Sequence, residues 1–311
     1  MRTVLGMLLL TPTRVGAIQL LSAPRMLHLA AWHPPRRRSA GTAMETTVEP
    51  DRPQPKESES QFLIANSGND VSVLKCPTPA VLQQGLLETA GLPQICIAGE
   101  SNAGKSSLIN HLLRKKSLAR ASSVAGKTRS VDMLLVNERV VVTDLPGLPS
   151  RDHQVADIWE HSWRPLVFNY MRNCDSLLAM VYVHDVRWKV SSLVREFLRE
   201  VRETTGLPVI LALTKDDKLA DEVRDGRPLK DAEAYRQAEI ALRQRLMGRI
   251  RKSLEFDGVH VHYSVNNDLP SSRRARRRLL RYVESIVEAG TREESEKLLR
   301  DIGDKHFADV L

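Results

Sequence analysis

The chain has 311 residues, of which 42% are hydrophobic, enough to bury one sizeable core and leave both termini outside it. The formal net charge is +8, but six arginines precede the first acidic residue, Glu45, and removing them leaves +2. Overall basicity is therefore weak evidence for nucleic-acid binding. Three cysteines without close spacing support neither a disulfide framework nor a zinc site, and we expect Cys76, Cys96 and Cys174 to be buried.

The first 40 residues are rich in Arg, Leu and Ala and contain no acidic residue. A helix formed from them can place Arg opposite apolar side chains, which is typical of a mitochondrial import signal. A secretory signal built on residues 4–10 is the alternative, but that apolar run is short and is followed by Pro12 and Arg14. We therefore predict a transit peptide at residues 1–40 and a place in the mitochondrial matrix, ranked above a plastid.

Residues 41–61 are polar and contain prolines, so they predict a disordered linker. From Phe62 to residue 290, apolar strands alternate with helical stretches, which indicates one α/β domain with a mostly parallel sheet and helices on both faces. Six strands are expected, at residues 94–98, 131–136, 139–143, 177–183, 208–213 and 259–263, with a hairpin turn at Asn137-Glu138. Helices are expected at residues 105–114, 155–171, 191–203, 232–252 and 272–288. Beyond the leader, no stretch of the sequence reaches the roughly 18 uninterrupted apolar residues that a membrane span needs, so we expect no stable membrane insertion.

The sequence GESNAGKS at residues 99–106 matches GxxxxGK[ST] between a predicted strand and a predicted helix. Glycines let the backbone wrap a phosphate closely, and the amides at a helix N-terminus stabilise negative charge. Lys105 would reach the β and γ phosphates, and Ser106 would ligate Mg²⁺. The predicted nucleotide-binding residues of this loop are Gly99, Glu100, Ser101, Asn102, Ala103, Gly104, Lys105, Ser106 and Ser107.

Two further motifs follow predicted strands. Asp144 begins the DLPG sequence, where a P-loop protein keeps the acid that holds Mg²⁺, and the amide of Gly147 would meet the γ phosphate. Thr214 begins TKDD, in which the carboxylate of Asp217 can accept both the ring N–H and the amino group of guanine. Lys215 would lie along the base. The pattern predicts GTP, and a kinase or ATPase would leave Asp217 unexplained.

These motifs resemble those of the EngB/YihA family of ribosome-assembly GTPases, within the TrmE-Era-EngA-EngB-Septin-like superfamily. The resemblance rests on GESNAGKSSLIN at residues 99–110, AGKTR at 125–129, the DLPG motif and LTKDDKL at 213–219, and it covers about residues 62–290. It implies a Ras-like P-loop GTPase fold. It also implies that Thr128 completes Mg²⁺ coordination and that Ser264 and Val265 contact the base.

Family members are associated with maturation of the large ribosomal subunit. For this chain the resemblance implies partners in an assembling organellar ribosome, namely large-subunit rRNA and ribosomal proteins, and we expect a monomer away from the ribosome. Arginines at 273, 274 and 276–278, and basic residues at 243, 245, 249, 251 and 252, could neutralise rRNA phosphates, although charged helix faces are often only solvated.

Three positions depart from the family pattern: Glu100 stands where the family usually has Arg, Ala125 replaces Pro, and Leu148-Pro149 replaces Tyr-Gly. The departures at Glu100 and Leu148-Pro149 motivate an alternative, a scaffold protein that occupies rRNA during assembly while binding nucleotide weakly or never hydrolysing it.

The predicted catalytic residues are Asn102, Lys105 and Thr128. Leu148 takes the position of the glutamine that orients water in Ras-type enzymes, so we expect slow hydrolysis. Asn102 would help to bind K⁺, which supplies positive charge to the transition state; the alternative is that Asn102 only caps its loop.

The tail at residues 291–311 opens with Thr291 and Glu294 at capping-box spacing, which predicts a short helix. Whether this helix contacts the domain or a partner is left open by the sequence. The histidines at 161, 184, 260 and 262 have no ligand-like spacing and are expected to be structural.

Overall fold

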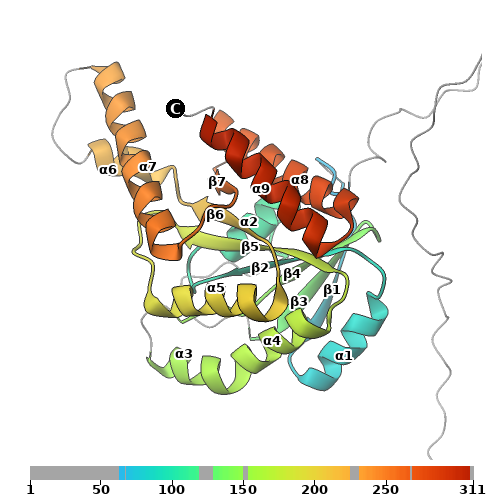
Figure 1. Cartoon of the computed structure of the whole chain (residues 1–311). Helices are drawn as coiled ribbons and strands as arrows, with labels where there is room; N and C mark the ends of the chain where they lie inside the picture. The colour runs from blue at the N-terminus through green and yellow to red at the C-terminus, as the bar shows by residue number, and fades with distance from the viewer. Residues whose placement is uncertain are drawn as a thin grey trace, which may run out of the picture. The chain divides into compact units, whose positions relative to one another are not determined.

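A seven-stranded sheet organises the described part of the chain, in the order β1-β3-β4-β2-β5-β6-β7 (Figure 1). This computed structural model describes residues 63–66, 68–118, 129–149, 153–224, 231–266 and 268–308, with backbone alone at 153–155 and 304–308. The predicted transit peptide, the linker and Thr128 lie outside these residues. All described residues belong to one unit, residues 34–311.

Five neighbouring strands of the sheet pair in parallel, and the two strands at one edge join it through antiparallel pairs. The strands are β1 (Val71–Cys76), β2 (Gln94–Gly99), β3 (Val131–Val136), β4 (Val140–Asp144), β5 (Leu177–Asp185), β6 (Val209–Thr214) and β7 (His260–His262). β4, β2, β5, β6 and β7 are parallel, whereas β3 pairs antiparallel with both β4 and β1. The predicted hairpin is confirmed: Asn137 and Glu138, at φ 52° and 54°, turn the chain between β3 and β4.

The mostly parallel α/β sheet is confirmed, but the predicted number of six strands is too low by one. The missed strand is β1, at the edge of the sheet, where most side chains are exposed or half-buried. An edge strand needs no continuous apolar run, so its sequence carries little of the pattern that revealed the buried strands. Its place is fixed by pairing with β3, from Val71 opposite Val136 to Cys76 opposite Val131.

Helices cover both faces of the sheet. They are α1 (Pro79–Glu88), α2 (Lys105–Leu112), α3 (His153–Ile158), the π-helical turn η1 (Trp159–Trp163), α4 (Arg164–Asn173), α5 (Ser192–Thr205), α6 (Lys218–Arg224), α7 (Ala232–Leu254), α8 (Pro270–Ala289) and α9 (Arg292–Ala308). The predicted helix at 155–171 is thus interrupted by a π turn. Within the described ranges, no helix combines the length and the apolar character needed to cross a bilayer.

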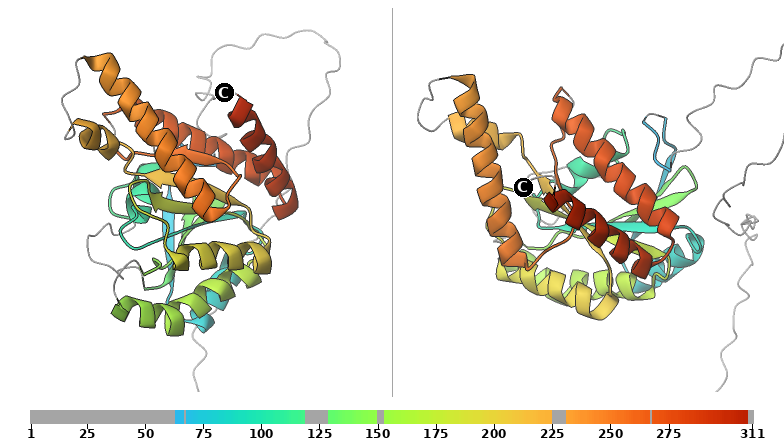
Figure 2. Two further views of the ribbon diagram at one scale, coloured as in Figure 1. Left: turned by 60° about the vertical axis from the view of Figure 1, so that its left-hand side comes forward. Right: turned by 45° about the horizontal axis from the view of Figure 1, so that its top comes forward.

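Alternation along the strands separates two apolar cores. In β2, Cys96 and Ala98 face one core with α1, α4, α5 and α7, while Ile95 and Ile97 face the other with α2, α8 and α9. Figure 2 shows α8 and α9 side by side on the second face. The three cysteines are buried, as the sequence predicted.

The tail helix α9 packs on the domain. Thr291 caps it as predicted, because the Thr291 hydroxyl accepts a hydrogen bond from the backbone N–H of Glu294 at 3.2 Å. The buried Leu299 belongs to the α2, α8 and α9 core. Arg292 donates to the carbonyls of Leu177 and Cys174, at 2.7 and 2.8 Å, and so binds the start of α9 to the amino end of β5.

The parallel strands bring several chain segments to one edge of the sheet. Their carboxyl ends are Asp144 of β4, Gly99 of β2, Asp185 of β5 and Thr214 of β6, followed by the loop after β7. Ligands of open α/β sheets bind at this edge.

Candidate functional site

The phosphate loop lies between β2 and α2, as its motif predicted. Gly104 precedes α2 with φ 102°, a left-handed conformation that side chains disfavour. A Cβ on Gly99 would lie 2.3 Å from the Val183 carbonyl oxygen, so this loop approaches β5 too closely for a side chain. The nine predicted residues, 99–107, therefore run from the end of β2 through a tight loop into the first turn of α2.

Lys105 points into this loop. Its Nζ donates to the carbonyls of Gly99 and Glu100, at 3.0 and 3.1 Å, and the side chain is buried. Burial lowers the pKa of Lys105, and the negative charges of Asp144 and Glu100 partly offset this effect. The loop thus holds a buried cation, which suits an anionic ligand.

Asp144 ends β4 and is 2% exposed. Its Oδ1 is buried and has no hydrogen-bond partner among the described residues. Burial raises the pKa of Asp144 to about 7, although the positive charge of Lys105 acts in the opposite direction. A buried carboxylate oxygen of this kind suits the water shell of a cation, so Asp144 fits the predicted Mg²⁺ site together with the half-buried Ser106.

The segment after Asp144 is paired to the phosphate loop. Leu148 donates its N–H to the Gly99 carbonyl at 3.1 Å and accepts from the Ser101 N–H at 2.8 Å. A Cβ on Gly147 would lie 2.9 Å from both Lys105 Nζ and Ser101 Oγ, so only glycine fits there without displacing a neighbour. Leu148 itself is fully buried and apolar, so its side chain offers no group to orient a water.

The first two residues of the TKDD motif hold the phosphate loop from the other side. The Thr214 hydroxyl donates to the carbonyls of Ala103 and His184, at 2.5 and 3.1 Å. Lys215 donates to the Asn102 carbonyl at 2.9 Å and pairs with Asp185 at 3.0 Å. The base motif and the phosphate motif, separate in sequence, are therefore one structure.

Asp216 is a site residue that the sequence analysis missed. Arg243 of α7 forks onto its carboxylate at 2.7 to 3.1 Å, and His262 Nδ1 lies 2.9 Å from Asp216 Oδ1. Burial alone would raise the pKa of Asp216, but the hydrogen bonds from His262 and Arg243 outweigh it and lower the pKa. Asp216 therefore fixes the loop that presents the half-buried Asp217.

The predicted base loop lies beside this motif. The Asp216 N–H donates to the Tyr263 carbonyl at 3.4 Å, which joins the TKDD segment to the end of β7. Ser264 is buried and its hydroxyl accepts the Asn266 N–H at 3.1 Å, whereas Val265 is exposed. Ser272 of α8 donates to the Ser264 carbonyl and so holds the loop in place.

Two predicted catalytic positions remain predictions. Asn102 is exposed at the tip of the phosphate loop with φ 66°, a left-handed conformation that asparagine tolerates. Thr128 lies outside the described residues. Among the described residues, no cluster of three or more His, Cys, Asp or Glu side chains is placed to hold a metal ion.

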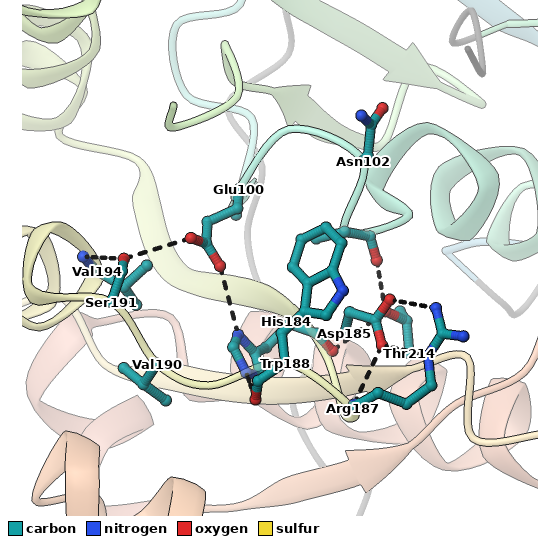
Figure 3. A network of polar contacts seen from close by, with 12 residues as sticks. Glu100, Asn102, His184, Asp185, Arg187, Trp188, Val190, Ser191, Val194 and Thr214 are labelled. Carbon is teal, nitrogen blue, oxygen red and sulfur yellow. Dashed lines mark hydrogen bonds and ion pairs between the residues drawn. The ribbon is translucent and has the colours of Figure 1, made fainter. Parts of the chain in front are cut away.

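The sequence departure at Glu100 has a structural counterpart. Figure 3 shows its side chain directed toward His184 and Ser191. Glu100 Oε1 accepts from the Ser191 hydroxyl at 3.3 Å, and Oε2 lies 3.8 Å from His184 Nδ1. The sequence shows the unusual acid but gives no signal for its partners, which lie more than 80 residues away.

Arg276 does not belong to the exposed arginine run in which the sequence analysis placed it. Its side chain is 1% exposed, and its guanidinium donates to the carbonyls of His111 and Leu112 at the end of α2. It also donates to Asn66 and Ala65. Arg276 therefore ties α8 to the helix that follows the phosphate loop, while the neighbours 273, 274, 277 and 278 are exposed.

Comparison with known proteins gives consistent results. Residues 94–215 match the family described as 50S ribosome-binding GTPase. The chain is 39% identical over 131 residues to the probable GTP-binding protein EngB of Gemmatimonas aurantiaca, covering 41% of this chain and 61% of that relative. It is 32% identical to the EngB of Syntrophus aciditrophicus and 35% identical to that of Bacillus subtilis, covering 52% and 47% of this chain and 86% and 72% of those relatives.

Solved structures with a similar arrangement include that of a probable GTP-binding protein engB. It has a TM-score of 0.43 and 22% identity, and covers 63% of this chain and 99% of that chain. Toc33 from Arabidopsis thaliana gives a TM-score of 0.44 and 18% identity, over 67% of this chain and 92% of that chain. The family assignment rests on the sequence relatives.

Proposed function

Because the chain belongs to the EngB family of GTP-binding proteins and has a P-loop GTPase fold, we propose that it binds GTP and GDP with Mg²⁺ and hydrolyses GTP slowly. The observation that carries this proposal is the joining of two motifs. Thr214 and Lys215 of the base motif hold the carbonyls of Ala103 and Asn102 in the phosphate loop. A single nucleotide can therefore contact both motifs at once, with its base at one and its phosphates at the other.

Each part of the nucleotide has residues of suitable chemistry. The amides of the phosphate loop and Lys105 bind the phosphates, and Asp217 accepts the two N–H donors of guanine. Lys215 lies along the base, and the loop at Ser264 and Val265 closes over it. Mg²⁺, when bound, neutralises charge on the β and γ phosphates, and Ser106, Asp144 and Thr128 are the residues that would hold it.

Asp217 provides the test of nucleotide identity. Replacing Asp217 by Asn exchanges one acceptor for a donor, which removes a hydrogen bond to guanine and leaves a donor facing a donor. We expect GDP affinity to fall by about a hundredfold, as is usual when a buried hydrogen-bonding pair is broken. Xanthosine diphosphate, which offers an acceptor at that position, should bind Asp217→Asn better than GDP.

Titration calorimetry with GDP, ADP and xanthosine diphosphate measures these affinities. Asp221→Asn, on the exposed face of α6, is the matched control and should keep GDP affinity unchanged. Equal affinity for GDP and ADP in the unaltered chain would refute the guanine assignment.

Hydrolysis is proposed to be slow because Leu148 replaces a water-orienting group with a buried apolar side chain. We propose that K⁺ bound beside Asn102 supplies transition-state charge in its place. Single-turnover rates in KCl should exceed those in NaCl, and Asn102→Ala should abolish the difference. Equal rates in both salts would contradict the role of K⁺.

The proposed cellular role is assembly of the mitochondrial large ribosomal subunit, with GTP hydrolysis acting as a switch: the GTP-bound chain associates with rRNA of the assembling subunit, and hydrolysis permits its release. It is supported by family membership, by the match to the 50S ribosome-binding GTPase family and by the acid-free leader. The exposed arginines of α8 would contact phosphates of large-subunit rRNA, and the chain would otherwise be monomeric. The alternative is that the leader directs the chain to a plastid. Import assays with isolated mitochondria and isolated plastids distinguish the two destinations.

A second candidate is an rRNA-binding scaffold that holds GTP without hydrolysing it. The buried Leu148 is the observation that favours it. Phosphate release by the purified chain bound to large-subunit particles distinguishes the two candidates. Repeated GTP hydrolysis supports the switch, and GTP that stays intact for hours supports the scaffold.

A further inference from the structure

A row of charged side chains crosses the antiparallel edge of the sheet and ends at Asp144. Lys75 of β1 lies opposite Asp132 of β3, and Asp132 lies opposite Asp144 of β4. Residues directly opposite each other in antiparallel strands project to the same face of the sheet, with Cβ atoms about 5 Å apart. Asp132 and Asp144 are therefore neighbouring carboxylates, although the predicted Mg²⁺ site includes only Asp144.

The face of the sheet that carries these two carboxylates is the one that α2 covers. Leu134, two residues after Asp132, belongs to the core that α2 shares, and so does Val142, two residues before Asp144. Side chains two residues apart in a strand project to the same face. Because β3 runs antiparallel to β4, Asp132 near the start of β3 lies beside the carboxyl end of β4. Asp132 is thus at the edge of the sheet where the proposed nucleotide binds.

The surroundings of Asp132 compensate its charge only in part. Its side chain is 18% exposed, and its Oδ1 accepts a hydrogen bond from the Ser130 hydroxyl. Its ion pair with Lys75 is long, at 3.8 Å from Nζ to Oδ2, and the Lys75 side chain is 65% exposed, so this pair contributes little. Burial raises the pKa of Asp132, and the Ser130 hydrogen bond and the charge of Lys75 oppose this only partly.

Asp144 is the group on which the charge of Asp132 acts. Burial raises the pKa of Asp144, and the negative charge of Asp132 raises it further, against the positive charge of Lys105. Asp144 Oδ1 is buried and has no hydrogen-bond partner in the part of the chain that the structure describes. Two neighbouring negative charges repel each other, whereas a divalent cation is attracted to both. The pair therefore favours a bound cation more than Asp144 alone would.

We propose that Asp132 is a second carboxylate of the Mg²⁺ site, which acts on the cation through its charge and not as a direct ligand. The inference rests on the proposed guanine-nucleotide site, in which Asp144 holds Mg²⁺ through its water shell. Without Mg²⁺, the charge of Asp132 repels the phosphates of the nucleotide; with Mg²⁺, it attracts the cation that the phosphates also bind. Asp132 therefore makes GDP binding depend more strongly on Mg²⁺.

Removal of the charge at position 132 tests this proposal, since Asn keeps the shape of the side chain. The affinity for GDP is measured by titration calorimetry in excess EDTA and in saturating Mg²⁺, for the unaltered chain, Asp132→Asn and Lys75→Gln. We expect Asp132→Asn to bind GDP about threefold more tightly in EDTA, and its gain in affinity on adding Mg²⁺ to be about tenfold smaller than that of the unaltered chain. A distorted fold would instead weaken binding in both conditions.

Lys75→Gln is the matched control, because it breaks the same ion pair from the other side. It removes a positive charge, so the gain from Mg²⁺ should not fall. Equal losses of this gain in Lys75→Gln and Asp132→Asn, or an unchanged gain in Asp132→Asn, would overturn the inference and leave the proposed function intact. Failure of the unaltered chain to bind GDP in either condition would overturn both.

Discussion

A side chain at position 147 would meet the two groups that shape the phosphate loop. An added Cβ lies 2.9 Å from Lys105 Nζ and 3.2 Å from Ser101 Cα, and the second of these atoms is backbone. Lys105 can move aside, but Ser101 cannot without displacing the loop. We therefore predict that Gly147→Ala reduces GDP affinity by at least about tenfold while the chain stays folded.

Gly248→Ala is the control for this substitution. Gly248 lies within α7 and a Cβ there meets no atom within 4 Å, so alanine should keep GDP affinity and raise helix stability by about 0.5 to 1 kcal/mol. Fluorescence titration and urea unfolding measure the two quantities. Unchanged GDP affinity in Gly147→Ala would show that the loop does not depend on this contact.

At the residue scale, the sequence was sufficient where a motif prescribes both residue type and position. Gly99, Lys105, Asp144 and Thr214 lie together as their motifs predicted. Arg276 could not be predicted in this way. It is an arginine like its exposed neighbours, and it is buried only because it lies on the side of α8 that faces the core. Such a distinction depends on what packs against the helix, which the local sequence does not contain.

At the scale of the element, the TKDD loop is fixed by contacts with α7 and β7. Because the pKa of Asp216 is lowered on folding, the ionised carboxylate stabilises the fold above the ordinary aspartate pKa of about 3.9. That stability is lost as pH falls from this value through the lower pKa of the folded state. Asp216→Asn should cost about 2 kcal/mol at pH 7, since it removes the negative charge that Arg243 and His262 share and replaces one of the two acceptor oxygens with a donor.

Urea unfolding at about pH 7 and about pH 3 measures this effect, and the difference between Asp216→Asn and the unaltered chain should shrink at the lower pH. Asp221, which forms an exposed ion pair with Lys218, is the control: Asp221→Asn should change the free energy of unfolding by less than about 0.5 kcal/mol at either pH. A pH-independent difference would mean that packing, rather than charge, fixes the loop.

The hydrogen bonds between α8 and the end of α2 give a second prediction at this scale. Burial lowers the pKa of Arg276 to about 10, so the guanidinium stays charged at neutral pH while it binds the last carbonyls of α2. Arg276→Leu leaves these acceptors buried without donors and should lower the free energy of unfolding by about 3 kcal/mol.

The neighbouring Arg277 is exposed, so Arg277→Leu should cost less than about 0.5 kcal/mol in the same urea titration. Similar losses in both variants would mean that the buried contacts of Arg276 add little. The buried strands could likewise be predicted because β2 and β5 contain continuous apolar runs, whereas β1 is an edge strand recognised only through its partner β3.

At the scale of the whole molecule, α8 connects the nucleotide site to the surface proposed for rRNA. Its buried side carries Ser272, which holds the base loop, and Arg276, which holds the end of α2. Its outer side exposes Arg273, Arg274, Arg277 and Arg278. The sequence predicted a basic helix here, but the two roles of its arginines required the packed structure.

The central claim is that nucleotide state controls binding to the large ribosomal subunit. Gradient sedimentation of the endogenous protein from lysed mitochondria tests it, with either GTP or a non-hydrolysable GTP analogue present. We predict that the analogue shifts the protein onto large-subunit particles and that GTP does not. A variant with Gln at the four exposed α8 arginines, expressed in the same cells, should show no shift. Sedimentation with these particles regardless of nucleotide, or never with them, would contradict the claim.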